Sequence, residues 1–210
     1  MRFEFSEDVS EEEKRIIFDK NLSFLEKNEN MTNFYFFRGV LSDEEISNIF
    51  HASEEYKWEE GNVSGEVVKS YRRSDIKWIP NEKKTRTIYS RLINLMKIAN
   101  KEMWNFHITG MEDDLQFTRY DENKRGFYDW HMDFGGYNSS TRKISMVVQL
   151  SEPDYTGGEL EFWINRGKIK APNERGTVIF FPSYLTHRVT ELEKGERYSL
   201  VSWFHGPTFI

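Results

Sequence analysis

A histidine and a carboxylate stand two residues apart near the middle of the chain, within the sequence YDWHMDFGG from Tyr128 to Gly136. Side chains alternate between the two faces of an extended strand, so His131 and Asp133 would point to the same side and Met132 between them would point away, into the core. An imidazole nitrogen and a carboxylate oxygen supply two of the three ligands of a 2-His-1-carboxylate site, which leaves other positions open on a non-haem Fe(II) ion. The short H-x-D pattern also arises by chance, and then the pair is merely hydrogen-bonded or solvated.

A third protein ligand has to come from another histidine or from a carboxylate. The other histidines are His51, His107, His187 and His205. His187 follows FFPS, an apolar run that predicts a buried strand ending in a turn, and it begins the next extended piece, HRVTEL. A lone histidine at such a place is more often a structural residue, so both interpretations stay open on this evidence.

An arginine follows ten residues after His187 and a serine twelve residues after it, in the apolar sequence ERYSLVSWF. Arg197 and Ser199 share one face of the predicted strand. On an inner face the guanidinium would need an anion, because a buried unpaired charge is very unfavourable, and its planar fork fits a carboxylate. The alternative is a surface arginine that pairs with Glu196 or Glu193. The order H-x-D, His, R-x-S is much rarer by chance than any of its parts.

The sequence pattern of the first half of the chain predicts helices with strand segments between them. Apolar residues at three- and four-residue steps predict helices over about 10–27 and 83–103, and Ser42 and Glu45 form a capping box for a third helix. Residues 34–37 predict a buried strand, and residues 67–80 predict short strands around the sequence Arg72-Arg73-Ser74. The side chains expected to be buried by the last two helices are Ile46, Ile49, Phe50, Ile88, Leu92, Leu95, Met96 and Ala99.

From residue 115 onward, short β-branched and aromatic runs alternate with clusters of Gly, Pro, Asn and Asp. These runs predict strands over 115–120, 144–150, 160–163, 177–181 and 198–204. Helices followed by a series of strands indicate an α+β fold with a mainly β core and helices behind one sheet. Short connected strands favour a sandwich or a jelly roll. No repeat or linker divides the chain, so the sequence predicts one domain.

The composition excludes several classes of protein and site. Hydrophobic residues make up 38% of the chain and charged residues 30%, which is typical of a folded soluble protein. The net charge is −6 and no basic block occurs, so no nucleic-acid partner is expected. Cysteine is absent, which excludes disulfides, zinc–thiolate sites and a thiol nucleophile. The acidic N-terminus and the lack of a long apolar run predict a cytoplasmic protein without a signal peptide or a membrane segment.

Around these residues the sequence resembles the Fe(II)/2-oxoglutarate-dependent dioxygenases, and within them the prolyl 4-hydroxylase-like branch with its bacterial relatives. The resemblance covers roughly Leu115 to Pro207, in LQFTRYDENKRGFYDWHMDF, ISMVVQLSEPDYTGGELEFW and GTVIFFPSYLTHRVTELEKGERYSLVSWFHGP, and more loosely residues 33–80. It implies a double-stranded β-helix, or jelly roll, over about 111–207. Helical and strand elements over about 1–110 would support this catalytic core within a single domain, 1–210.

The resemblance also implies a metal site and a cosubstrate site. His131, Asp133 and His187 match the Fe(II) ligands of the family. Arg197 matches the residue that holds the distal carboxylate of 2-oxoglutarate, and Ser199 could add a hydroxyl donor.

Four further residues match positions near the cosubstrate or the substrate. Tyr120 matches a tyrosine that contacts 2-oxoglutarate, and Tyr128 matches an aromatic position near the substrate. Gln149 departs from the family pattern, because prolyl hydroxylases often carry a tyrosine there, although a glutamine amide could make a comparable bond to the cosubstrate. Trp203 lies on the strand face of Arg197 and could either wall the substrate pocket or pack in the core.

The activity implied is hydroxylation, most naturally of a peptidyl proline as in procollagen-proline 4-dioxygenase-like enzymes, with O2 as cosubstrate and succinate and CO2 as products. Ascorbate is a candidate further requirement. One alternative is a hydroxylase of the same superfamily that acts on a free amino acid, a small metabolite or another protein residue. A more remote one is a non-catalytic, cupin-like binding protein. The expected partner is a peptide, protein or small-molecule substrate, and the oligomeric state stays open.

Overall fold

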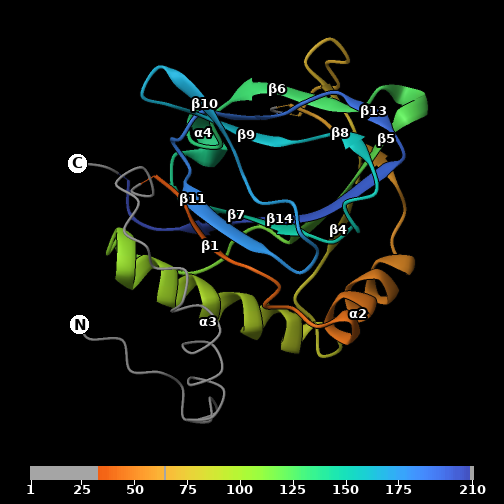
Figure 1. Cartoon of the computed structure of the whole chain (residues 1–210). Coiled ribbons are helices and arrows are strands. Elements are labelled where there is room, and N and C mark those ends of the chain that lie inside the picture. The colour runs from red at the N-terminus through yellow and green to blue at the C-terminus, as the bar shows by residue number, and fades with distance from the viewer. Residues whose placement is uncertain (1–32, 64, 209–210) are drawn as a thin grey trace. The chain divides into compact units, whose positions relative to one another are not determined.

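The structure is a computed structural model that describes residues 33–63 and 65–208, which fall within one compact unit, Thr32–Ile210. Two β-sheets lie face to face in this unit, and the helices α2 and α3 lie against the outer side of the larger sheet (Figure 1). The helix predicted over 10–27 lies outside the described residues, and a single domain over 1–210 therefore stays a prediction. None of the described helices has the length and apolar character needed to cross a membrane.

The larger sheet has seven strands, and all its pairings are antiparallel. In spatial order its strands are β1 (Tyr35–Phe37), β11 (Val178–Pro182), β7 (Arg142–Gln149), β14 (Glu196–His205), β5 (Leu115–Asp121), β4 (Asp75–Ile79) and β2 (Glu59–Glu60). The strands predicted over 34–37, 115–120, 144–150, 177–181 and 198–204 all belong to this sheet, with ends shifted by at most two residues. The C-terminal strand β14 lies at its centre.

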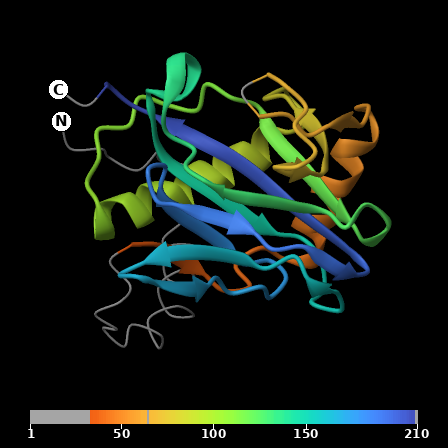
Figure 2. The same cartoon turned by 90° about the horizontal axis from the view of Figure 1, so that it is seen from above.

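The smaller sheet covers the inner face of the larger one, as the view from above shows (Figure 2). Its five strands are β10 (Gly167–Lys170), β9 (Leu160–Ile164), β12 (His187–Val189), β6 (Phe127–His131) and β3 (Arg72–Arg73), and a short ribbon pairs β13 (Leu192–Lys194) with β8 (Thr156–Gly157). All these pairings are antiparallel too. Two facing antiparallel sheets confirm the predicted mainly β, jelly-roll core.

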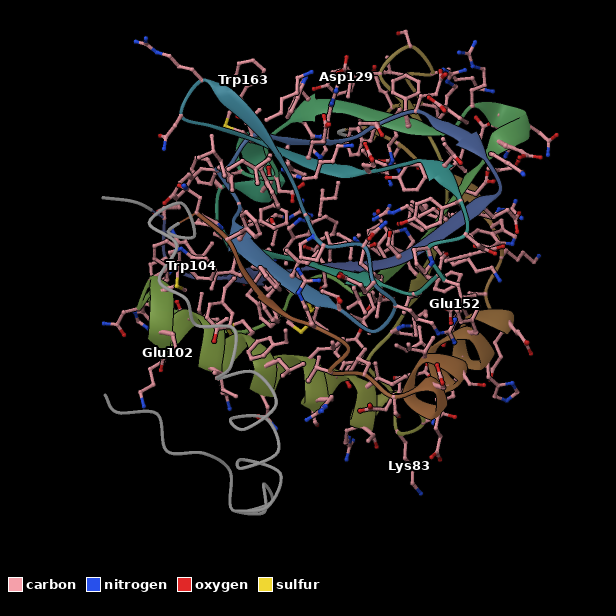
Figure 3. All side chains as sticks on the ribbon, in the orientation of Figure 1. Lys83, Glu102, Trp104, Asp129, Glu152 and Trp163 are labelled. Carbon is pink, nitrogen blue, oxygen red and sulfur yellow. The ribbon has the colours of Figure 1, made fainter. Side chains whose placement is uncertain are left out.

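Two longer helices support the larger sheet. Helix α2 (Asp43–Glu54) begins at the predicted capping box: the Ser42 hydroxyl accepts the Glu45 N–H at 3.2 Å, and the Glu45 carboxylate accepts the Ser42 N–H at 2.7 Å. Helix α3 (Arg86–Met103) turns Glu102 into solvent (Figure 3). Two single turns, η3 (Glu122–Lys124) and α4 (Gly136–Ser139), complete the described helices.

The buried side of α3 differs from the prediction by one residue. Tyr89 is buried where Ile88 was expected, and the other buried positions are Leu92, Leu95, Met96 and Ala99. The Tyr89 hydroxyl donates to the Ile79 carbonyl at 2.7 Å and accepts the Leu115 N–H at 3.0 Å. A tyrosine that satisfies its hydroxyl in this way can be fully buried, so it replaces the apolar isoleucine at the sheet.

Apolar side chains fill part of the space between the two sheets (Figure 3). One buried cluster contains Phe34, Val147, Leu160, Phe162, Ile164, Ile179 and Phe181, and a smaller one contains Tyr120, Val189 and Leu192. Between the sheets, beside these clusters, lies a cavity of about 1000 Å³ lined by residues of β5, β6, β12 and β14. The fold thus leaves one large cavity against a rigid β framework.

Candidate active site

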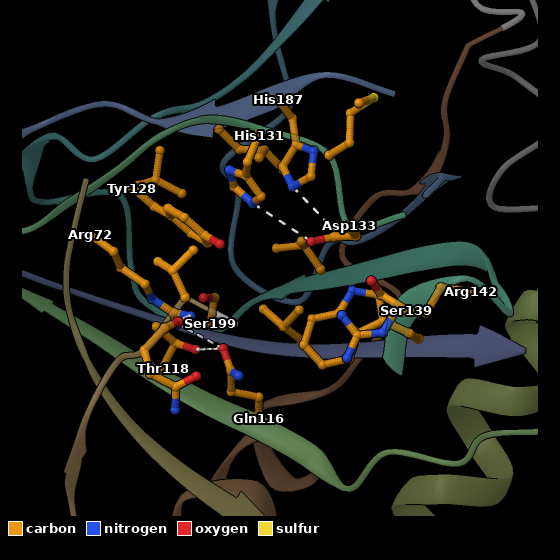
Figure 4. Close-up of a pocket in the computed structure, with 18 of the residues that line it drawn as sticks. Arg72, Gln116, Thr118, Tyr128, His131, Asp133, Ser139, Arg142, His187 and Ser199 are labelled. Carbon is orange, nitrogen blue, oxygen red and sulfur yellow. Dashed lines mark hydrogen bonds and ion pairs between the residues drawn. The ribbon is translucent and has the colours of Figure 1, made fainter. Parts of the chain in front are cut away.

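The structure brings His131, Asp133 and His187 together at the cavity (Figure 4). His131 ends strand β6, His187 begins strand β12, and the two stand opposite each other in the antiparallel pairing. The Nε2 atom of each histidine lies 3.6 Å from a carboxylate oxygen of Asp133. One ligand atom from each of the three residues lies within 4.8 Å of the others, which is close enough for all three to hold one metal ion.

Asp133 reaches this position from a bend and not from the strand that was predicted to carry it. Strand β6 ends at His131, and the N–H groups of Asp133 and Phe134 both donate to the Ser183 carbonyl, at 2.9 and 3.0 Å. Met132, predicted to pack in the core, is 54% exposed and lines the cavity, so that prediction is wrong. Once the chain leaves the strand, the strict alternation of inner and outer faces no longer applies.

The ligand atoms of the three side chains are oriented by further hydrogen bonds. The Nδ1 atom of His131 lies 2.7 Å from the Asp129 carbonyl, and that of His187 lies 2.9 Å from the Leu185 carbonyl. A carbonyl only accepts, so each Nδ1 carries a proton, and each Nε2 faces Asp133. The Ser145 hydroxyl donates to the Asp133 carboxylate at 2.6 Å.

The electrostatics of the cluster favour the protonation states that bind a cation. Burial, together with the neighbouring His187, lowers the pKa of His131 to about 3. Burial raises the pKa of the Asp133 carboxyl, but His187, His131 and the Ser145 hydrogen bond outweigh this effect and lower that pKa below its ordinary value. At neutral pH His131 is therefore neutral and Asp133 ionised, as a metal ligand must be.

Arg197 lines the same cavity and is only 1% exposed, so the alternative of a surface arginine paired with Glu196 or Glu193 is wrong. Its Nη2 donates to the Gln149 side-chain oxygen at 2.9 Å, whereas its Nε and Nη1 are buried and have no hydrogen-bond partner among the described residues. Buried donors are nearly always satisfied, and a guanidinium fork fits a carboxylate in two parallel bonds. The residues present therefore fit both Fe(II) and a dicarboxylate that reaches Arg197.

Tyr120 and Ser199 also line the cavity, next to Arg197. Tyr120 stands opposite Arg197 in the pairing of β5 with β14, and Ser199 lies two residues further along β14. Gln149 is not among the lining residues: its amide nitrogen donates to the Pro172 carbonyl at 3.0 Å, and its oxygen accepts from Arg197. This placement makes Gln149 a support for Arg197.

The two residues expected near the substrate, Tyr128 and Trp203, both line the cavity. The Tyr128 ring stacks on the His131 imidazole, with ring centroids 3.6 Å apart. Trp203 is 6% exposed, and the Arg142 guanidinium lies 3.7 Å from the centre of its ring. Trp203 therefore forms a cavity wall and a packed part of the core at once.

Sequence reasoning missed several polar residues of the cavity and its support. Arg72, Gln116, Thr118 and Arg142 line the cavity, and Ser145 orients Asp133. The sequence held one usable signal for Ser145: a serine within the apolar run ISMVVQL must lie in the core and needs a hydrogen-bond partner there. No comparable signal marked Arg72, since a charged residue beside a second arginine is ordinarily exposed.

Comparison with known proteins supports this interpretation. Residues 115–205, which include the metal trio and Arg197, match the model of the 2OG-Fe(II) oxygenase superfamily. A PKHD-type hydroxylase of Prochlorococcus marinus strain MIT 9515 is 26% identical over 147 residues, which are 70% of this chain and 65% of that protein. The PKHD-type hydroxylase YbiX of Escherichia coli strain SMS-3-5 is 26% identical over 183 residues, which are 80% of this chain and 76% of YbiX.

Solved structures share the fold. A prolyl hydroxylase from Trichoplax adhaerens, in complex with a peptide fragment of the hypoxia inducible factor oxygen degradation domain, superposes with a TM-score of 0.74 at 18% identity, over 94% of this chain and 95% of that one. A prolyl-4-hydroxylase from Pseudomonas putida gives 0.66 at 21% identity, over 85% and 96% of the two chains. Residues 115–205 are thus similar to the 2OG-Fe(II) oxygenase superfamily, and the chain shares the fold of the solved prolyl hydroxylases.

Proposed function

We propose that this protein is an Fe(II)- and 2-oxoglutarate-dependent hydroxylase that acts on proline residues of a polypeptide. One observation carries the proposal: three residues that could hold one metal ion line the same cavity as a buried arginine, two of whose nitrogens have no hydrogen-bond partner among the described residues. A merely structural His–Asp cluster would not require such an arginine. The combination therefore favours an oxygenase over a cupin-like binding protein.

Each part of the cavity has a distinct task in this function. His131, Asp133 and His187 would hold Fe(II), and Arg197, supported by Gln149, would bind the distal carboxylate of 2-oxoglutarate. When bound, the metal and the cosubstrate supply the oxidising chemistry, which inserts one oxygen atom of O2 into a C–H bond while 2-oxoglutarate becomes succinate and CO2. The β framework fixes the orientation of these groups and keeps water away from them.

Two observations favour proline as the substrate. The Tyr128 and Trp203 rings form aromatic walls of the cavity, and such walls suit a pyrrolidine ring, which is apolar and rigid. The neighbours of similar fold include prolyl hydroxylases, one of them in complex with a peptide. A neighbour from Paramecium bursaria Chlorella virus-1, a collagen prolyl hydroxylase, is a complex with 2-oxoglutarate, at 21% identity and a TM-score of 0.60.

A two-stage experiment tests the proposal. First, Fe(II) and 2-oxoglutarate are added together without O2, and a weak visible absorption band is expected only when both are present. Second, proline-containing peptides, free amino acids and small metabolites are screened with O2 for succinate and for a product heavier by one oxygen atom. A hydroxylated proline peptide supports the proposal. If only free amino acids or metabolites give products, the enzyme is a hydroxylase of small molecules and not of prolyl peptides. The absence of both the absorption band and succinate would contradict an oxygenase.

A further inference from the structure

A second buried arginine lies in the same cavity as Arg197. Arg72 belongs to strand β3, stands opposite Tyr128 in the pairing with β6, and is 6% exposed. Its guanidinium lies 4.7 Å from the centre of the Tyr128 ring and points toward Gln116 and Thr118 on the opposite sheet (Figure 4). Arg72 therefore faces the substrate side of the cavity, beside the aromatic ring that stacks on His131.

Arg72 is held in place by neutral groups only. Its Nε donates to the Ser74 hydroxyl at 2.8 Å, its Nη1 to the Asn62 carbonyl at 3.1 Å and its Nη2 to the Gln116 side-chain oxygen at 2.9 Å. Within the described part of the chain, no carboxylate oxygen lies within 4.0 Å of this guanidinium. These hydrogen bonds orient the side chain but leave its positive charge uncompensated. Nη1 and Nη2 each carry two hydrogens, and only one on each nitrogen is used in these three hydrogen bonds.

This environment is unusual for an arginine of this protein. Over residues 33–63 and 65–208, the arginines with a carboxylate within 4.0 Å are Arg38, Arg73, Arg91, Arg119, Arg125, Arg142, Arg175 and Arg188. Arg86 and Arg166 are exposed to solvent. The remaining two, Arg72 and Arg197, are buried and line the cavity. Arg197 matches the cosubstrate-binding residue, and Arg72 is then the second cation that lacks an anion.

The two arginines serve different parts of the cavity. Arg197 stands opposite Tyr120 on β5, whereas Arg72 bonds to Gln116, four residues earlier on the same strand. The Arg197 guanidinium donates to Gln149 on β7, so the two guanidiniums are held by different acceptors on different strands. A group bound at Arg72 is therefore separate from the distal carboxylate at Arg197.

The cavity would carry a net positive charge even with Fe(II) and 2-oxoglutarate bound. Apart from the two histidines, its charged lining residues are Arg72, Arg197, Asp133 and the ion pair of Arg142 with Asp113. Fe(II) and the 2-oxoglutarate dianion cancel each other, and Asp133 balances one arginine. One positive charge remains, and a buried positive charge strongly favours a negatively charged ligand.

We propose that Arg72 is a substrate-recognition residue that binds a carboxylate of the substrate, so that the enzyme prefers anionic over neutral substrates. This inference rests on the proposed function only in that the cavity must take a substrate next to the metal. The carboxylate can belong to an acidic side chain next to the reacting residue or to the C-terminus of the chain. Both sources present the same planar group to the Arg72 fork.

The experiment uses the enzyme loaded with Fe(II) and 2-oxoglutarate and three short proline peptides of equal length. The first has blocked ends and a glutamate next to proline, the second has glutamine in that place, and the third has glutamine and a free C-terminal carboxylate. Binding is measured without O2 by titration calorimetry, and turnover with O2 by succinate release. We expect one of the two carboxylate peptides to bind about ten- to a hundredfold more tightly than the neutral one, as for a hydrogen bond to a charged group.

Variants assign the preference to Arg72. Arg72→Gln should abolish the difference between carboxylate and neutral peptides, Arg72→Lys should keep part of it, and the affinity for 2-oxoglutarate should stay the same. Arg175→Gln is the matched control, since it removes an arginine outside the cavity and should keep the full preference. Equal binding of all three peptides by the unaltered enzyme would overturn the inference without any variant, and so would a preference that survives Arg72→Gln.

The inference and the proposed function can fail independently. If the proline peptides are hydroxylated without a carboxylate preference, the function stands and the role of Arg72 is wrong. If no peptide is hydroxylated but the carboxylate peptides still bind in an Arg72-dependent manner, the recognition site stands and proline is the wrong target.

Discussion

The Ser145 hydroxyl donates a hydrogen bond of 2.6 Å to the Asp133 carboxylate and thereby joins the two sheets at the candidate metal site. Ser145 lies in β7 of the larger sheet, whereas Asp133 follows β6 of the smaller one. The Ser183 hydroxyl lies 3.0 Å from the Ser145 hydroxyl, and the Ser183 carbonyl accepts the Asp133 N–H. The larger sheet therefore fixes both the side chain and the backbone of the only carboxylate in the trio.

Replacing Ser145 should weaken metal binding without abolishing it. Ser145→Ala removes the bond that orients the Asp133 carboxylate, and loss of such a partner typically lowers metal affinity about ten- to a hundredfold. Anaerobic titration with Fe(II) measures the change. Ser202→Ala is a matched control, because the buried Ser202 hydroxyl has no hydrogen-bond partner and does not line the cavity. Equal Fe(II) affinity in Ser145→Ala and the unaltered protein would contradict an orienting role.

Removing a ligand of the trio should abolish the reaction. Asp133→Ala leaves two histidines without the carboxylate, and such a pair binds a divalent cation far more weakly than the full set. We expect no substrate-dependent succinate above background, even after reconstitution with excess Fe(II), and the same for His131→Ala. Asp154→Ala, at an exposed aspartate, serves as the control. Full activity of the reconstituted Asp133→Ala protein would refute the metal site.

Arg197 should govern the affinity for 2-oxoglutarate. Arg197→Ala removes the two buried nitrogens that have no partner in the described part of the chain. Loss of a buried charged hydrogen-bonding group typically costs about 2 kcal/mol or more, or at least thirtyfold in the dissociation constant. Arg197→Lys keeps the charge but loses the fork, so its affinity should be intermediate. Anaerobic titration with 2-oxoglutarate gives these constants. An unchanged constant in Arg197→Ala would place the cosubstrate elsewhere.

Gln149 should act on the cosubstrate through Arg197. Gln149→Leu removes the one hydrogen-bond acceptor that Arg197 has among residues 33–63 and 65–208, which should lower the affinity for 2-oxoglutarate by less than Arg197→Ala does. In the double variant, the loss should equal that of Arg197→Ala alone, because Gln149 has no independent contact to lose. Additive losses in the same titration would instead show that Gln149 binds the cosubstrate directly.

Those features of the fold that depend on local pattern were predictable from the sequence. The capping box at Ser42 and the five strand runs of the larger sheet follow from residue types within a few positions, and the structure has them within two residues. Asp133 and His187 are 54 residues apart in the chain, and they meet because β6 pairs with β12. The resemblance to the dioxygenase family implied that Asp133 and His187 lie together, whereas the periodicity of apolar residues could not predict a contact between such distant parts of the chain.

The direction of single side chains was the least predictable feature. The sequence Arg72-Arg73-Ser74 places two arginines on opposite faces of a strand, and nothing local decides which one points inward. The pairing of β3 with β6 turns Arg72 into the cavity, whereas Arg73 pairs with Glu191. Met132 was misjudged for a similar reason, because the end of β6 at His131 is set by the Ser183 carbonyl, a tertiary contact.

Asp75 anchors the edge of the larger sheet by two ion pairs. Its carboxylate lies 2.9 Å from Arg119 of β5 and 2.6 Å from Lys124 of η3, and its side chain is 7% exposed. Burial raises the pKa of the Asp75 carboxyl, but the hydrogen bonds from Lys124 and Arg119 outweigh burial and hold that pKa below its ordinary value of 3.8. The ionised form therefore stabilises the folded state.

Asp75→Asn should lower the free energy of unfolding at pH 7 by about 1–3 kcal/mol, with Lys124 contributing little because it is largely solvated. A depressed pKa in the folded state gives stability that is present above the unfolded-state value and is lost as the pH falls through the folded-state value. The difference between the two proteins should therefore be constant at neutral pH and shrink below about pH 4. Denaturant titrations over this pH range measure it, with Asp154→Asn as an exposed control. A difference that does not change with pH would show that packing, and not the charge of Asp75, stabilises this edge.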